Sequence, residues 1–314
     1  MTVLRWFEDF PPGLERRYGR FALSAEAIAS YAAMFGPADA AGAGVAGPAE
    51  PPPLMLCSIL MRLNCDGWLG DAAGRGAPGI DEIHWRTPAQ VGEILSARFR
   101  VLDSRPSGSR PDIGFVRFRY DLLANDDRVV LTQTNSVMIA RRDGGDAPAA
   151  GATRAAVGPA PVSRDTELPA RWADAALGTP YALGVVTFDP DGIVGFAQHY
   201  DPQPFHLDHA AAQAGPFGAL AASGWHTASA WAQAFAARCA AQGLVVPRLL
   251  SATDLRWRRP VYAGDTLAFE TTITAVSPVG ESLTMRAHGT GTNQDGVTAF
   301  AFEADMVVPA GHAA

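Results

Sequence analysis

Residues 200–208 read YDPQPFHLD and place the carboxylate of Asp201 five residues before the imidazole of His206. Between them, Pro202 and Pro204 each restrict φ and disfavour helix in the preceding residue. We therefore expect a stiff, extended loop, rather than a helical turn, that holds the two side chains facing each other across a water molecule. Such a pair can activate water, because both groups accept hydrogen bonds from it and either can take its proton. The alternative is a surface turn in which Asp201 caps a helix and His206 packs beside it.

A second chemical element is the segment 215–227, GPFGALAASGWHT, which leads into a long apolar helix predicted over residues 216–240. A glycine-containing segment at a helix N-terminus exposes unpaired N–H groups and the positive end of the helix dipole, which suits an oxyanion. Alternatively, Gly218 and Gly224 only allow the helix to approach the sheet closely. His226, one helical turn past Ser223, either faces the active-site cavity or is a satisfied histidine packed within the helix.

The elements that must position these residues come from an internal repeat. Residues 80–95 (IDEIHWRTPAQVGEIL) and 252–267 (ATDLRWRRPVYAGDTL) share Trp, Arg, Pro, Gly and Leu at one offset, and residues 27–37 match 192–202. The repeat predicts two copies of one fold in tandem. Ala, Gly and Pro dominate residues 143–169, which are expected to form a surface linker, and a similar loop is predicted over 36–53. We predict an N-terminal repeat at 1–142, a linker at 143–172 and a C-terminal domain at 173–314.

Within each repeat, a helical pattern precedes runs of alternating polar and apolar residues. The runs are rich in β-branched and aromatic residues and are separated by turn signals, which indicates antiparallel hairpins. They cover residues 255–262, 265–276, 282–292 and 297–308 in the second repeat, and 94–103, 114–123 and 128–140 in the first. The helix over 216–240 is apolar around much of its circumference, so it should be wrapped by other structure. The predicted fold is α+β, with a long central helix wrapped by a bent antiparallel sheet, twice over.

Composition narrows the class of function. The 314 residues carry a net charge of −7, which argues against a nucleic-acid groove. All 25 basic residues are Arg, so a Schiff-base lysine, a pyridoxal-phosphate anchor and a P-loop lysine are excluded. The three cysteines form no C-x-x-C pair, and the N-terminus lacks a signal-peptide pattern. The uncharged stretch 209–237 is Ala-rich and interrupted by polar groups, so we expect no membrane span and a cytoplasmic protein.

Four segments together resemble the MaoC-like dehydratases, relatives of the (R)-specific enoyl-CoA hydratases: FAQHYDPQPFHLD, FGALAASGWHT, LRWRRPVYAGDTL and TNQDG. The family motif is an Asp, two residues of which the second is usually Asn, a Pro, an aliphatic residue, a His and, two residues on, an Asp. The motif is met by Asp201, Pro204, His206 and Asp208, with Gln203 in place of Asn and Phe205 in place of the aliphatic residue. The match covers the second half of the chain and is fainter in the first.

The resemblance implies a tandem, or double, hot-dog fold and a hydro-lyase that reversibly hydrates a 2-enoyl-CoA to a 3-hydroxyacyl-CoA. It assigns Asp201 and His206 to holding and deprotonating water, and the N–H of Gly218 to stabilising the thioester oxygen. No metal is needed, and no cofactor beyond the coenzyme A thioester that is the substrate. Further substrate contacts are expected from Phe205, Ser223 and His226. Arg105 and Arg110 are candidates for the coenzyme A phosphates, although solvated loop charges are the alternative.

The first repeat departs from the motif, because Gly36 aligns with Asp201 and Ala41 with His206. One active site per chain is therefore expected, and the degenerate half either enlarges the cavity for the acyl chain or serves only as a pairing partner. Other functions stay open: a mesaconyl-CoA-type hydratase for branched or dicarboxylic acyl groups, which would want an extra buried cation, an acyl-CoA thioesterase, or a non-catalytic acyl-CoA-binding subunit. Association of the chains into a homo-oligomer is also left open.

Overall fold

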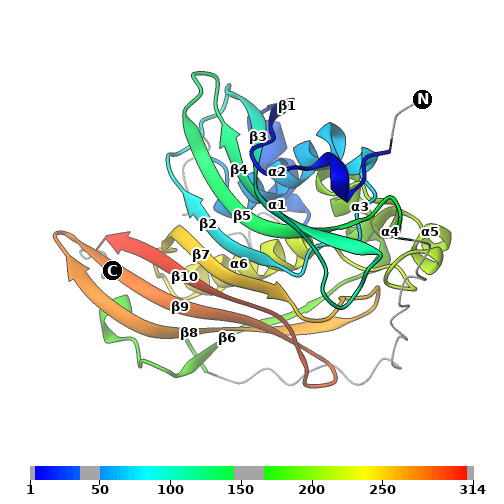
Figure 1. Ribbon diagram of the computed structural model, residues 1–314. Helices are drawn as coiled ribbons and strands as arrows, with labels where there is room; N and C mark the ends of the chain where they lie inside the picture. The colour runs from blue at the N-terminus through cyan, green and yellow to red at the C-terminus, as the bar shows by residue number, and fades with distance from the viewer. Residues whose placement is uncertain (1–3, 36–49, 145–165, 310–314) are drawn as a thin grey trace.

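The computed structural model describes residues 4–35, 50–144 and 166–309 (Figure 1). The N-terminal half contains, in chain order, η1 (Phe7–Asp9), β1 (Glu15–Ala22), α1 (Ala25–Ala33), α2 (Pro53–Gly67), η2 (Leu69–Asp71), β2 (Ile80–Trp85), β3 (Ile94–Pro106), β4 (Ile113–Leu123) and β5 (Val129–Ala140). The C-terminal half contains η3 (Trp172–Asp174), β6 (Pro180–Thr187), α3 (Pro190–Tyr200), α4 (Pro204–Leu207), α5 (His209–Ala214), α6 (Gly224–Ala241), β7 (Arg248–Trp257), β8 (Thr266–Val279), β9 (Ser282–Asn293) and β10 (Thr298–Pro309).

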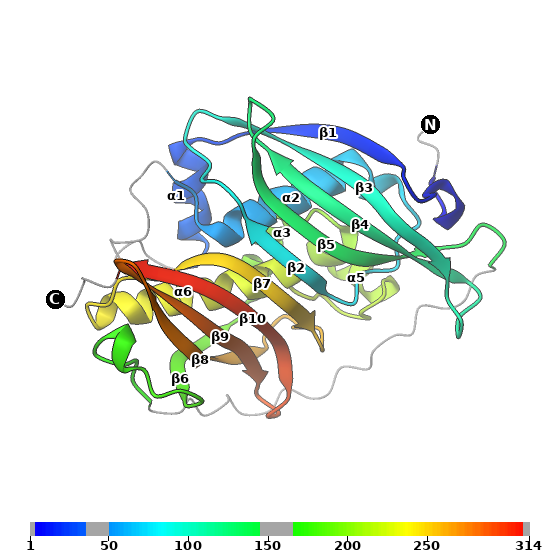
Figure 2. The ribbon, with the colours of Figure 1, turned by 60° about the vertical axis from the view of Figure 1, so that its left-hand side comes forward.

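The strands form one ten-stranded sheet in the order β1-β3-β4-β5-β2-β7-β10-β9-β8-β6. Read outward from the centre, each half has the same order: its second strand innermost, then its fifth, fourth and third, and its first strand at the edge. All neighbouring strands are antiparallel, and the sheet curls around the helices in both halves (Figure 2). The predicted α+β architecture of two repeated units is therefore confirmed.

The two halves join where β2 pairs antiparallel with β7, with Ile83 opposite Ala252. The sequence segments that repeat most clearly, 80–95 and 252–267, thus include all of β2 and the second half of β7. Each seam strand also ends on a tryptophan that binds the first residue of a central helix. Trp85 Nε1 donates to the Pro53 carbonyl of α2, and Trp257 Nε1 donates to the Gly224 carbonyl of α6, both at 2.8 Å. The repeat therefore preserves the docking of each helix on the sheet.

Helix α6 is the central helix of the C-terminal half and is buried along most of its length. Trp231 of this helix is 1% exposed. Its ring meets the Phe302 ring edge-on with 4.7 Å between ring centres, and its Nε1 donates to the Glu270 carbonyl at 2.9 Å. The prediction that the helix starts at residue 216 is wrong, because it begins at Gly224 behind the N-cap Ser223. The preceding residues run through a turn with φ +70° at Gly218, a conformation that no helix contains.

Strand β7 also differs from its prediction. It occupies Arg248–Trp257 rather than residues 255–262, since Pro260 has no N–H with which to continue a ladder. Most of the predicted linker, residues 145–165, and most of the predicted loop, residues 36–49, lie outside the described residues, so these predictions stay untested. Among the described helices, none is both long and apolar enough to cross a bilayer.

Candidate functional site

The site is built on the segment that follows α3. This helix ends at Tyr200, and residues 201–203 form neither helix nor strand, because the N–H of Gln203 donates to the Asp201 carbonyl at 2.7 Å and closes a tight turn. The expectation of an extended loop as far as His206 is wrong, because Pro204 opens a helical turn, α4, that carries the histidine. Proline is well suited to the first position of a helix, where its missing N–H costs nothing and its φ is already helical. The prolines therefore fix the segment as expected, but by starting a turn.

Asp201 and His206 face each other, both almost completely buried. His206 Nε2 lies 3.6 Å from Asp201 Oδ2, which is beyond a direct hydrogen bond and lets both atoms accept a hydrogen bond from a shared partner. The other ring nitrogen, Nδ1, lies 2.7 Å from the carbonyl of Ala221. Because a carbonyl only accepts, we assign the proton of the neutral imidazole to Nδ1. Nε2 is then the basic nitrogen and points at the carboxylate.

The Asp201 carboxylate is held by three donors. Ser223 Oγ donates to Oδ2 at 2.6 Å, and Gln203 Nε2 donates to Oδ1 at 2.9 Å. The third donor is the Cys65 thiol, whose sulfur lies 3.6 Å from Oδ1. These bonds fix both oxygens in direction, so the carboxylate cannot rotate away from His206. Gln203, which replaces the usual Asn of the motif, thus supports the carboxylate directly.

Cys65 belongs to α2, so the N-terminal half reaches into the site. Three residues earlier on the same helix, Arg62 Nη1 donates to the carbonyls of Gln198 and His199 at the end of α3, at 2.9 and 3.2 Å. Those carbonyls have no partner within their own helix, as is usual for a last turn, and a cation there also complements the helix dipole. Helix α2 therefore clamps the end of α3 at the point where Asp201 leaves it.

Replacing Cys65 with Ala is expected to lower kcat by about two- to fivefold, because one weak donor to Asp201 is lost while two stronger donors remain. Steady-state rates would be compared with those of Cys57→Ala, which removes the other thiol of α2, a buried one that makes no described contact with Asp201. Equal rates for the wild-type protein and Cys65→Ala would show that this donor does not position the carboxylate.

The N-terminus of α6 passes beside the pair. Ser223 caps the helix by accepting the N–H of Trp225 at 3.2 Å, while its hydroxyl proton goes to Asp201. The next residue, Gly224, is the first of the helix, and its N–H has no hydrogen-bond partner among the described residues. By contrast, Gly218 lies six residues before the helix, and its N–H is directed at the Gly215 carbonyl at 3.4 Å. The expectation that Gly218 stands at the start of this helix is therefore wrong.

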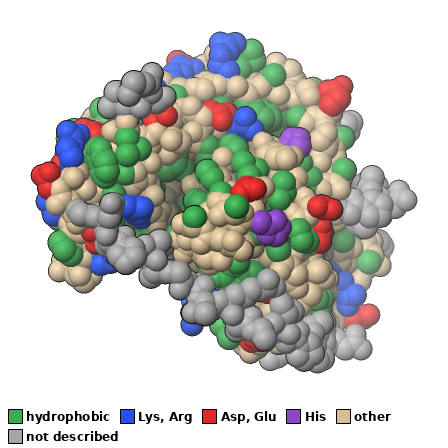
Figure 3. All heavy atoms as spheres, turned by 90° about the vertical axis from the view of Figure 1, so that its right-hand side faces the viewer, with side chains coloured by type: hydrophobic (Ala, Val, Ile, Leu, Met, Phe, Trp, Pro, Cys, Tyr) green, Lys and Arg blue, Asp and Glu red, His purple; other side chains and the backbone are tan. Residues whose placement is uncertain are grey.

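The predicted substrate-binding residues fall into two groups. The Phe205 ring packs against the rings of His206 and Phe217, with 4.5 and 5.3 Å between ring centres, so it covers one side of the imidazole. Ser223 and His226 lie on the first turn of α6, beside the site. Figure 3 shows the face that carries α3–α5, where the described side chains mix both signs of charge with apolar surface.

Arg105 lies near the end of β3, and Arg110 lies in the hairpin loop between β3 and β4. The guanidinium of Arg105 stacks 5.1 Å from the centre of the Phe115 ring, and Arg110 pairs with Asp112 at 2.6 Å. No described contact joins either arginine to Asp201 or His206. Their assignment to the coenzyme A phosphates stays a prediction.

His226 is buried against aromatic rings, stacking on Phe196 at 4.7 Å with Phe188 at 5.1 Å. Its Nδ1 is fully enclosed without a hydrogen-bond partner among the described residues. The expectation of a satisfied histidine is therefore wrong. Burial lowers the pKa of His226 from 6.5 to about 4, with Asp189 opposing the shift and His206 adding to it.

This pKa predicts how stability depends on pH. Between pH 6.5 and about 4 the imidazole is protonated in the unfolded chain but neutral in the folded one. The unfolded state therefore binds more protons, and the free energy of unfolding should fall by up to about 3 kcal/mol as the pH is lowered through this window. Urea unfolding of the wild-type protein and of His226→Leu would isolate this contribution. The variant should show a shallower fall, whereas the exposed-site variant His199→Leu should match the wild type.

Together these elements define a class of protein: two tandem units, each a central helix wrapped by an antiparallel sheet, with a buried Asp–His pair in the C-terminal unit. A model of the MaoC like domain matches residues 173–294, which contain the pair and the start of α6. A MaoC-like dehydratase from Rhodospirillum rubrum is 31% identical over 44% of this chain and 96% of its own, with a TM-score of 0.38. Residues 173–294 therefore form a MaoC like domain, as the motif around Asp201 and His206 predicted.

Two further solved structures cover nearly the whole chain. A MaoC domain protein from Chloroflexus aurantiacus superposes with a TM-score of 0.75 at 17% identity over 98% of both chains. A Mycobacterium tuberculosis protein with a double hotdog fold gives a TM-score of 0.67 at 18% identity, over 96% of this chain and 98% of its own. The double hot-dog fold is thereby confirmed. No curated protein matched the sequence significantly.

Three parts of the site were missed by reasoning on the sequence: the Cys65 thiol, the Ala221 carbonyl and the free N–H of Gly224. Cys65 lies 136 positions from Asp201, and no local pattern signals its approach. Gly224 could have been found, because Ser223 is a preferred N-cap residue and marks the true helix start. The positions aligned with the pair in the first repeat, Gly36 and Ala41, lie outside the described residues.

Proposed function

We propose that the protein is a hydro-lyase that adds water reversibly across the 2,3 double bond of a 2-enoyl-CoA, giving a 3-hydroxyacyl-CoA. The observation that carries the proposal is the buried pair of Asp201 and His206, whose facing atoms are 3.6 Å apart beside an unpaired N–H at the start of α6. The family membership of residues 173–294 supports a dehydratase domain.

In the proposed step, a water molecule donates hydrogen bonds to Asp201 Oδ2 and His206 Nε2 and is oriented by them. As its oxygen bonds to C3 of the enoyl thioester, His206 Nε2 takes one of its protons and the electron pair of the double bond moves toward the thioester carbonyl. The Asp201 carboxylate stabilises the resulting imidazolium. The imidazolium then returns the proton to C2, which restores the neutral imidazole and completes the addition. These proton transfers need no redox cofactor.

The negative charge that develops on the thioester oxygen must be stabilised by a hydrogen-bond donor. We assign that role to the N–H of Gly224 in place of Gly218, because Gly224 opens α6 and adjoins the residue that binds Asp201. The dipole of an eighteen-residue helix adds a favourable potential at this point. Ser223 therefore supports both parts of the site, because it caps the helix that carries the Gly224 N–H and also orients the Asp201 carboxylate.

The experiment that tests the proposal is a spectrophotometric assay with crotonyl-CoA, followed by the loss of the conjugated-thioester absorbance, with free thiol measured in parallel. Loss of absorbance without thiol release, absent in Asp201→Asn, is the expected result. Thiol release would identify a thioesterase instead. Tight binding of crotonyl-CoA with neither signal would identify a non-catalytic acyl-CoA-binding protein.

A further inference from the structure

A cavity of about 310 Å³ lies between the first helix of the N-terminal half and the central helix of the C-terminal half. This volume is at the lower end of the range for small-molecule sites. Its apolar wall is formed by Ala32, Met34 and Phe35 at the end of α1 and by Ala230, Ala234 and Ala237 from one face of α6. Polar groups are added to the described lining by Thr187, Asp189, His226 and Gln233. Both halves of the chain are therefore needed to enclose it.

His226 stands at one end of this cavity. The side chain is 6% exposed, and neither ring nitrogen has a hydrogen-bond partner among the described residues. Nδ1 is fully enclosed, so Nε2 is the nitrogen that a ligand in the cavity can reach. A ligand oxygen that forms a hydrogen bond with Nε2 among these aromatic rings would gain a favourable contact. Of the polar side chains on the described lining, Thr187 and Asp189 are exposed and Gln233 is half-buried, so His226 is the one that is buried.

The cavity and the proposed reaction centre lie about one helical turn apart along α6. Ser223 donates to Asp201, and His226 follows three residues later on the same helix, which is roughly one turn or 5 Å along its axis. The ring of His226 also stacks on Phe196 of α3, the helix that leads to Asp201. An acyl chain whose thioester oxygen meets the Gly224 N–H can therefore extend past His226 into the cavity.

The charges around the cavity are unsuited to an anion. Its described lining contains no arginine, and its only carboxylate is Asp189, which lies at an exposed position and accepts the N–H of Gly192 at 2.9 Å. An acyl carboxylate placed beside His226 would lose its hydration without gaining a cation. A hydroxyl or keto oxygen carries no such cost and can pair with the imidazole.

We infer that this cavity receives the acyl chain and selects uncharged chains that present a hydroxyl or keto oxygen to His226, over chains with a carboxylate at the same place. The inference rests on the proposed function, and it makes His226 a specificity-determining residue. It also decides against a dicarboxylic acyl group as the preferred substrate.

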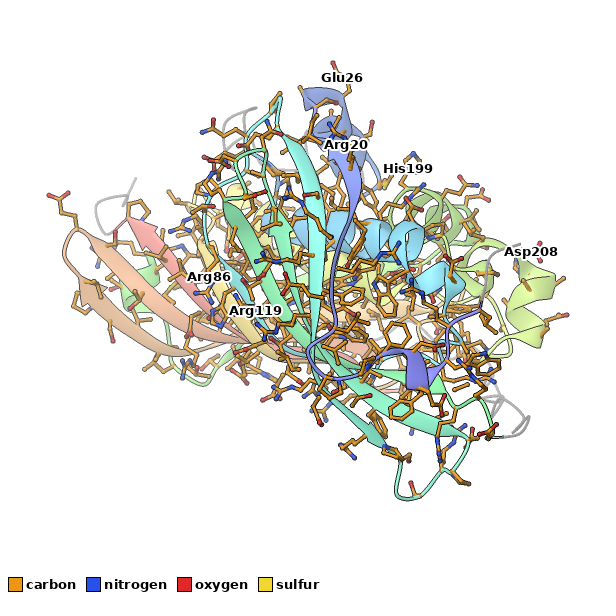
Figure 4. The ribbon with its side chains drawn as sticks, turned by 45° about the horizontal axis from the view of Figure 1, so that its top comes forward. Arg20, Glu26, Arg86, Arg119, His199 and Asp208 are labelled. Carbon is orange, nitrogen blue, oxygen red and sulfur yellow. The ribbon has the colours of Figure 1, made fainter. Side chains whose placement is uncertain are left out.

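The test compares three six-carbon thioesters that share one skeleton: 2-hexenoyl-CoA, 5-oxo-2-hexenoyl-CoA and 2-hexenedioyl-CoA. We expect kcat/KM for the oxo compound to exceed that for the plain chain by about tenfold, and the dicarboxylic compound to fall about 100-fold below the plain chain. In His226→Leu the preference for the oxo group should disappear. The control is His199→Leu, an exposed histidine outside the cavity (Figure 4), which should keep all three ratios.

A binding measurement separates this inference from the proposed function. Calorimetry on Asp201→Asn with the saturated counterparts (hexanoyl-CoA, 5-oxohexanoyl-CoA and adipoyl-CoA) should give the same order of affinities without any turnover. Preference for the dicarboxylic compound, or an oxo preference that survives His226→Leu, would overturn the inference even if hydratase activity is present. Absence of turnover in the wild-type protein, together with the expected order of affinities, would overturn only the proposed function.

Discussion

Asp201→Asn is expected to lower kcat for the hydration of crotonyl-CoA by about 10²- to 10⁴-fold, the range for loss of a general acid–base partner. The amide keeps the size of the side chain but exchanges one acceptor oxygen for an NH₂ group. Ser223 or Gln203 would then face a donor instead of an acceptor, and the imidazolium would lose its anionic neighbour. The measurement is kcat from the absorbance assay, with the affinity for saturated butyryl-CoA determined alongside. That affinity should change by no more than a few-fold.

The matched control for this variant is Asp208→Asn. Asp208 is also a carboxylate of the motif, but it is exposed at the edge of the molecule (Figure 4) and accepts the N–H of Ala211 at 2.8 Å as the N-cap of α5. Asn is an equally good N-cap residue, so folding and turnover should be preserved. Turnover of Asp201→Asn above one tenth of the wild-type value, or an equal loss in Asp208→Asn, would rule out the proposed role of the pair.

Gly224→Ala is expected to reduce kcat by about 10²- to 10³-fold, the effect of removing one oxyanion donor. The added Cβ would lie 2.4 Å from a ring carbon of Trp257, so the start of α6 or the tryptophan must move. Trp257 cannot move freely, because its Nε1 donates to the Gly224 carbonyl at 2.8 Å. The displaced N–H would no longer point at the developing oxyanion. Overpacking should also cost about 1–3 kcal/mol of stability, measurable as a lower Tm.

A second glycine separates these two effects. Gly195 lies within α3, where a Cβ would have open space around it, so Gly195→Ala should leave kcat unchanged and keep or slightly raise the Tm. If Gly224→Ala retained kcat within about threefold while its Tm fell, the N–H would serve only the packing of the helix and the oxyanion assignment would fail.

The N-terminal half lacks the motif but takes part in the site through several contacts. It supplies the Cys65 thiol to Asp201 and the Arg62 guanidinium to the end of α3. It also supplies Tyr31, whose hydroxyl donates to Ser229 of α6 at 2.6 Å, and Phe35, which packs on His226. These contacts favour the view that the degenerate half shapes the cavity over the view that it is only a pairing partner.

The repeat, the α+β fold and the pairing of Asp201 with His206 could all be predicted from the amino-acid sequence. The repeat can be recognised because the two seam strands keep the same contacts with their central helices, as Trp85 and Trp257 show. The pair of Asp201 and His206 could be predicted because both residues lie in one short segment whose prolines restrict the backbone locally. Both signals depend on interactions between near neighbours or on comparison of the chain with itself.

The groups that surround the pair, and the residues that line the cavity, could not be predicted from the sequence, because they depend on tertiary packing. Cys65, Ala221 and Gly224 reach the site through the packing of α2 and α6, and His226 loses its expected partners because rings from three other segments enclose it. Such contacts join residues far apart in the chain, and their distances depend on how helices pack against one curved sheet. Local propensity and spacing carry no information about those distances, so they became known only once the fold brought both halves together.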